Sequence, residues 1–139
     1  MKLNLPDVSL WIVALWWGAL TVVGFGVVPM LFANLSTPAI AGAMAAKLFS
    51  ALNWLTVICG VLLMIIFRSN QPAELENKAY PAIFFVMIGM LTALLLEFAI
   101  APRIVARQDL RLWHSVGTGL YVLQWVCATV TFRKISSRS

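Results

Sequence analysis

The sequence predicts an all-α integral membrane protein, built as an up-down bundle of four transmembrane helices. Residues 8–46 contain no charged side chain, and about 20 apolar residues already span the hydrocarbon core of a bilayer. Three more apolar runs follow, at residues 48–67, 81–100 and 112–132. Only 11% of the residues are charged, whereas about 25% are charged in a typical soluble domain.

The composition also bounds the domain organisation and the partners. Four spanning helices and short connections account for the residues of this sequence, so we expect a single membrane domain over residues 1–139. The net charge of +5 comes from residues at helix ends, where Lys and Arg set topology and meet lipid headgroups. We therefore expect no nucleic-acid partner. Cys59 and Cys127 lie inside predicted spans without a CxxC spacing, and we interpret both as packing residues. No extended repeat is evident.

The helix boundaries follow from the apolar runs and from the residues at their ends. Pro38 favours a helix start, with Ser36 or Thr37 as the cap, and Asp109 is the expected cap of the last helix. The predicted helices cover residues 8–32, 38–67, 80–101 and 110–132.

Small residues and prolines mark the expected helix contacts and kinks. Ala14 and Gly18 have the small-xxx-small spacing that lets two helices approach closely. Pro29 and Pro102 are expected to kink or end the first and third helices. The full set of such positions is Ala14, Gly18, Gly24, Pro29, Gly42, Pro102 and Gly119.

The distribution of Lys and Arg predicts the orientation. The side of the membrane that holds both termini carries Lys2, Arg68, Lys78, Arg133, Lys134 and Arg138. The other side carries Lys47, Arg103, Arg107 and Arg111. The first group is larger, so the positive-inside rule places both termini in the cytoplasm. We expect a multi-pass protein of the bacterial inner membrane.

Ionisable residues of three predicted spans fall at one depth. At 1.5 Å per residue, Lys47, Glu97 and His114 lie about 26–31 Å from the cytoplasmic boundary, near the opposite edge. Together with Arg103 and Ser115 they form a candidate polar layer. A contact of Glu97 with His114 or with Lys47 would offset the cost of partial burial. Two interpretations stay open: an ion pair that fixes helix register, and a polar pocket or permeation entrance.

Several kinds of chemistry are excluded or disfavoured. No catalytic triad, phosphate-binding loop or zinc-ligand spacing is present, and one histidine cannot ligate a haem from both sides within a single chain. Met30, Met44 and His114 are weak candidates for a cuprous site, because thioethers and imidazole suit soft metals. Methionines in membrane proteins are mostly packing residues, so we expect no metal. Because the motifs named above are absent, we also expect no cofactor and no enzymatic activity.

Short motifs along the chain resemble a known family. They read Gly24-Phe-Gly-Val-Val-Pro-Met-Leu-Phe32, Ala41-Gly42, Leu48-Phe49, Ala101-Pro-Arg-Ile104 and Leu112-Trp-His-Ser115. Their order resembles the bacterial domain-of-unknown-function 4149 family, related to the eukaryotic transmembrane-protein-205-like proteins. The resemblance implies a four-helix membrane protein without a settled activity. It implies motif positions at Gly24, Pro29, Phe32, Gly42, Phe49, Pro102, Arg103, His114 and Ser115. The eukaryotic relatives' link to export of metal-based drugs keeps transport in view.

Three functions are therefore considered. The first is a non-enzymatic membrane protein that handles a small solute or metal through the polar layer. The second is a haem-pathway oxidoreductase, since the size and helix count are similar to the four-helix protoporphyrinogen oxidase family. The first helix here lacks the histidine of that family's pattern. The third is a structural subunit whose small-residue seams dock a second copy or another membrane protein. The lipid bilayer is the expected partner in each case.

Overall fold

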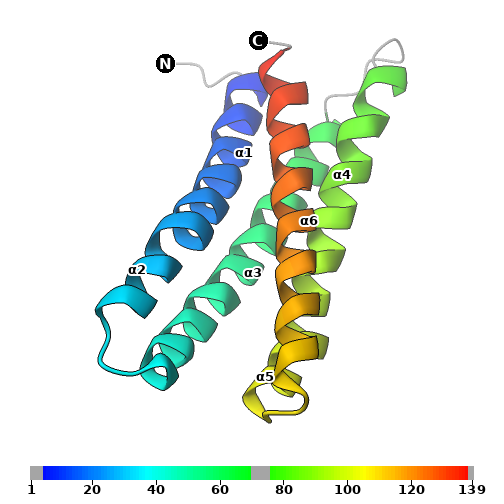
Figure 1. Ribbon diagram of the computed structural model, residues 1–139. Helices are drawn as coiled ribbons and strands as arrows, with labels where there is room; N and C mark the ends of the chain where they lie inside the picture. Colours follow the sequence, from blue (N-terminus) through cyan, green and yellow to red (C-terminus); the bar gives the residue numbers. More distant parts are fainter. Residues whose placement is uncertain (1–4, 70–75, 138–139) are drawn as a thin grey trace.

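The computed structural model describes the backbone of residues 5–69 and 76–137, and the side chains of residues 8–69 and 81–137. The described chain is helical almost throughout (Figure 1). The elements, in chain order, are α1 (Leu5–Val22), η1 (Val23–Val27), α2 (Val28–Asn34), α3 (Pro38–Ser69), α4 (Glu76–Leu95), η2 (Leu96–Ile100), α5 (Ala101–Val105) and α6 (Leu110–Ser136).

The predicted all-α fold with four spanning helices is confirmed. Among the described residues, four continuous helical stretches are long and apolar enough to cross a membrane: Val8–Asn34, Pro38–Ser69, Pro81–Val105 and Leu110–Ser136. The predicted caps are also found. The Thr37 hydroxyl accepts from the Ile40 N–H at 3.3 Å, and the Asp109 carboxylate accepts from the Leu112 N–H at 3.3 Å.

The first and third spans continue through their prolines instead of ending there. Just before Pro29 and Pro102 the chain forms a π-helical turn, η1 and η2 respectively. Proline has no N–H, and its ring clashes with the carbonyl four residues earlier in an α-helix. A π turn adds one residue to the turn and relieves that clash, so helical pairing resumes beyond it. Short helices α2 and α5 follow, each with the proline in its first turn.

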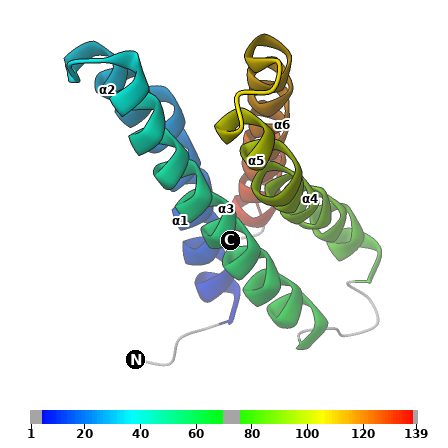
Figure 2. The ribbon, with the colours of Figure 1, turned by 90° about the horizontal axis from the view of Figure 1, so that it is seen from below.

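The bundle consists of two similar hairpins. The first contains α1, η1, α2 and α3, and the second contains α4, η2, α5 and α6. Helix α1 packs on α3 and α6, and α4 also packs on α3 and α6, so α1 and α4 occupy opposite corners. We call the end with the two connections, residues 35–37 and 106–109, the hairpin end. Seen from this end, the two connections lie well apart (Figure 2).

Residues at corresponding positions of the two hairpins contact each other. Trp16 and Gly89 stand the same number of residues before Pro29 and Pro102, and the Trp16 ring packs on Gly89. Phe49 and Tyr121 stand equally far from the first residues of α3 and α6, and their ring centroids are 5.1 Å apart. The two hairpins thus share the order of their elements and the spacing of these residues within them.

Glycines at the helix contacts differ from those expected. A Cβ atom on Gly24 would lie 2.5 Å from the Tyr121 ring, and one on Gly89 would lie 2.7 Å from the Trp16 ring. By contrast, a Cβ atom on Gly18, Gly42 or Gly119 would meet no neighbouring atom within 4 Å. Of the predicted packing glycines, Gly24 receives a side chain of this chain. The other three face open space on it.

We predict that Gly89→Ala destabilises the protein, whereas Gly119→Ala does not. Trp16 is fully buried and its indole N–H is hydrogen-bonded, so the ring cannot move away from a new methyl group. Overpacking of this kind costs about 1–3 kcal/mol. Alanine at the open Gly119 gains helix propensity of up to about 1 kcal/mol. Thermal unfolding in detergent, followed by circular dichroism, measures both; equal midpoints for the two variants would contradict the packing at Gly89.

Candidate functional site

Glu97 is the one carboxylate within the four described spans. It lies in the π turn η2 and is partly buried. Its Oε1 accepts a hydrogen bond from the Ser50 hydroxyl at 2.6 Å, and its Oε2 accepts one from the Asn53 side-chain amide at 3.1 Å. A carboxylate inside a membrane is costly, and such residues usually mark functional sites. We call Glu97, Ser50 and Asn53 the carboxylate site.

The position of the site follows from local helix geometry. Ser50 and Asn53 are three residues apart on α3, so their side chains project from one face of that helix. Asn53 is only 5% exposed and is held against the second hairpin. The bonds from Ser50 and Asn53 therefore join α3 of the first hairpin to η2 of the second.

The other members of the predicted polar layer do not bind Glu97. Within the described part of the chain, Glu97 forms no ion pair with Lys47 or His114, which are both exposed. Arg103 donates to the carbonyl of Ala99, and its guanidinium lies 4.6 Å from the centre of the Trp113 ring.

Ser115 is likewise directed to its own helix. Its hydroxyl donates to the carbonyl of Arg111 at 2.8 Å, and it is exposed. The layer thus separates into a partly buried carboxylate with two neutral donors, and exposed groups at the hairpin end.

A second polar cluster lies at the centre of the bundle and was not predicted. The Trp16 indole N–H and the Gln124 amide both donate to the Thr56 hydroxyl, at 2.9 Å and 2.6 Å. All three side chains are fully buried, and they come from α1, α3 and α6. The Gln124 Oε1 has no hydrogen-bond partner. We call these three residues the central cluster.

The central cluster continues the polar face of the carboxylate site. Thr56 follows Ser50 and Asn53 at intervals of three residues on α3. At 1.5 Å per residue, this face reaches about 9 Å along the helix from Ser50 to Thr56. The regular spacing of these polar residues within an apolar run was the sequence signal that could have shown it.

A seam between α1 and α6 is also held by polar contacts. The Tyr121 hydroxyl donates to the Leu20 carbonyl at 2.6 Å, and the Trp125 indole donates to the Thr21 hydroxyl at 2.9 Å. The Trp17 indole donates to Thr129 at 3.0 Å. Because these bonds tie one helix to the next, the seam fixes the packing of α1 on α6.

The described residues do not gather the usual ligands of a transition metal. No group of three or more His, Cys, Asp or Glu side chains is found among them. Cys59 and Cys127 are buried and free. The weak cuprous candidates Met30, Met44 and His114 are all exposed, on α2, α3 and α6. The arrangement at Glu97, a carboxylate with oxygen and amide neighbours, suits a proton or a hard cation better than a soft one.

We predict that one shape-conserving change in the central cluster destabilises the protein and that another leaves its stability nearly unchanged. Thr56→Val leaves both the Trp16 N–H and the Gln124 amide unpaired in the interior, which costs about 1–3 kcal/mol for each group. Gln124→Leu removes the unpaired Oε1 and leaves the Trp16–Thr56 bond in place, so its stability should stay within about 1 kcal/mol of the parent. Unfolding midpoints in detergent test the order, and a larger loss for Gln124→Leu would contradict it.

Comparison with known proteins identifies the family. Residues 11–112 match the family described as "Domain of unknown function (DUF4149)". No curated protein and no solved structure matches the chain. The match extends from α1 through the carboxylate site to the start of α6 and covers most of the chain. The protein is therefore a multi-pass membrane protein that belongs to the DUF4149 family.

Proposed function

We propose that this protein is not an enzyme but binds and passes a small cation, the proton included, through the carboxylate site. The observation that carries the proposal is the bonding of Glu97. Its two oxygens bind neutral donors, Ser50 and Asn53, and no Lys, Arg or His among the described residues pairs with it. A carboxylate held in this way can exchange a proton or accept a cation without displacing a built-in counter-ion.

The polar face of α3 supports passage rather than binding alone. Glu97 accepts a hydrogen bond from Asn53, and three residues further along α3 Thr56 accepts one from Gln124 in the middle of the bundle. The unpaired Gln124 Oε1 is an oxygen acceptor at the inner end of this series. Oxygen and amide groups in such an order are the usual surroundings of a hard cation or a water chain.

The π turn at Glu97 supports the same function. Glu97 lies in the π turn before Pro102, where the α-helical pairing of the backbone is interrupted. Interrupted helices in membranes often direct backbone carbonyls to ions. Carboxylate and carbonyl oxygens thus lie within one turn of the third span.

A second candidate function is a subunit that docks on another membrane protein or on a second copy. Gly18, Gly42 and Gly119 favour it, because each leaves open space where a neighbouring helix could approach. In this case substitutions at these glycines, rather than at Glu97, would remove the function.

Reconstitution into liposomes tests the first proposal. Purified protein is placed in vesicles that contain a pH-sensitive dye, and a potassium gradient with valinomycin drives proton entry; a parallel set measures sodium uptake. We expect uptake of one of the two cations, and Glu97→Gln should reduce it about tenfold or more, because a charge-assisted contact is worth about 1.5–3 kcal/mol. Glutamine has the same shape and can still accept from Ser50, so the fold should be kept.

The control is another carboxylate at the hairpin end. Asp109→Asn removes that charge but keeps a residue that caps α6 well, so uptake should equal that of the parent. Uptake that is the same in the Glu97→Gln protein as in the parent, or absent from the parent itself, would refute the proposal.

A further inference from the structure

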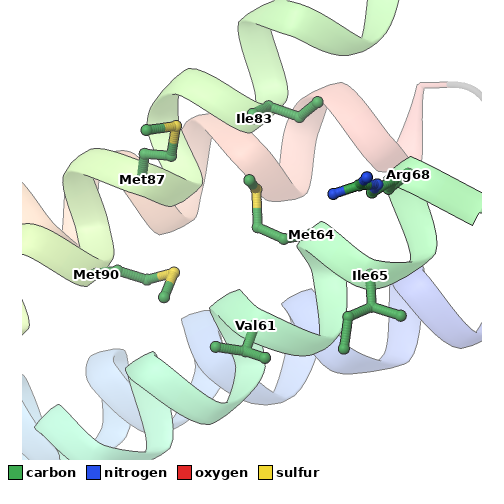
Figure 3. A pocket seen from close by; sticks show the side chains of 7 residues that line it. All are labelled: Val61, Met64, Ile65, Arg68, Ile83, Met87 and Met90. Carbon is green, nitrogen blue, oxygen red and sulfur yellow. The ribbon is translucent and has the colours of Figure 1, made fainter.

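A groove between α3 and α4 lies at the opposite end of the bundle from the carboxylate site. Its volume is about 640 Å³. Figure 3 shows Met64 and Met90 reaching into the space between the two helices, with Arg68 toward one end. The lining residues are Val61, Met64, Ile65, Arg68, Ile83, Met87 and Met90.

We propose that this groove binds one acyl chain of an anionic phospholipid, with the headgroup phosphate on Arg68. The inference is independent of the proposed function. All lining residues belong to the second and third spans, and Val61, Ile65 and Met87 are 43–59% exposed, so the groove opens toward the lipid. An occupant must therefore come from the membrane.

The depth of Arg68 matches the headgroup of such a lipid. Arg68 lies in the last turn of α3, where the span ends at Ser69. From Arg68 to Val61 the groove extends about 10 Å along the helix at 1.5 Å per residue, toward the bilayer centre. A phosphate at Arg68 would thus place its acyl chain on the apolar part of the lining.

The charges favour an anionic occupant. Arg68 is the one charged residue of the lining, and no carboxylate among the described residues pairs with it. A guanidinium binds phosphate through two parallel hydrogen bonds. The rest of the lining is aliphatic and thioether, and flexible methionines adapt to chains of different length and unsaturation.

Native mass spectrometry of the full-length protein tests the proposal. The protein is delipidated in detergent and titrated with phosphatidylglycerol or with phosphatidylcholine of the same acyl chains. We expect one phosphatidylglycerol to bind at least about tenfold more tightly than phosphatidylcholine. Phosphatidylcholine has the same phosphate but also a choline ammonium, so only phosphatidylglycerol offers Arg68 a net negative charge. Arg68→Gln should remove this preference, since it removes the positive charge that distinguishes the two lipids.

Two matched controls separate this site from general lipid attraction: one for Arg68→Gln, and one for a second variant that fills the groove. Arg133→Gln removes an exposed arginine in the last turn of α6, and the preference should remain. Met87→Trp fills the groove while Arg68 stays, and it should weaken phosphatidylglycerol binding. Ile58→Trp, at a residue of similar exposure outside the groove, should not. Equal binding of the two lipids, an unchanged preference in Arg68→Gln, or an equal loss in Arg133→Gln would overturn the proposal.

Discussion

Helices in a bilayer gain little by burying apolar surface against one another, because the surrounding lipid tails are as apolar as leucine. The association of these four helices therefore depends on hydrogen bonds and on close approach at small residues. The Thr56 hydroxyl, which accepts from Trp16 and from Gln124, joins three of the four helices at one point. Gly89 completes the arrangement, since only a missing side chain on α4 lets the Trp16 ring reach its place.

The two prolines act under the same constraint. A backbone group without a partner is costly in lipid, and a proline within a span creates one. In both spans a π turn before the proline accommodates it, and a residue of that turn contacts the other hairpin. Gly24 of the first turn receives the Tyr121 ring, and Glu97 of the second binds Ser50 and Asn53. The positions that disturb the helix are thus the positions that meet the neighbouring hairpin.

The sequence predicted the positions of residues along the helices, but not the directions of their side chains. Apolar length and the 1.5 Å rise per residue locate four spans and put Lys47, Glu97 and His114 toward one end, as expected. Which way a side chain points depends on the rotation of its helix, at about 100° per residue, and an extra residue in a π turn changes it. The partners of Glu97 could not be derived for that reason.

The central cluster was missed for a related reason. Thr56 and Gln124 stand in apolar runs far apart in the sequence. They come together only in the assembled bundle, where side chains from the diagonally opposite helices α3 and α6 meet in the interior. The packing glycines could not be identified from the sequence either. Gly89 faces a ring and Gly119 faces open space on this chain, and the sequence does not distinguish the two.

The shared element order of the two hairpins has a consequence for stoichiometry. Gly24 and Glu97 occupy corresponding places, each the same number of residues before its proline. In the first hairpin this place is filled by the ring of Tyr121, and in the second it holds a carboxylate. Of these two corresponding places only the second carries an acidic residue, so the described spans of one chain hold one carboxylate site. Cooperativity between like carboxylate sites would therefore require a second copy of the chain.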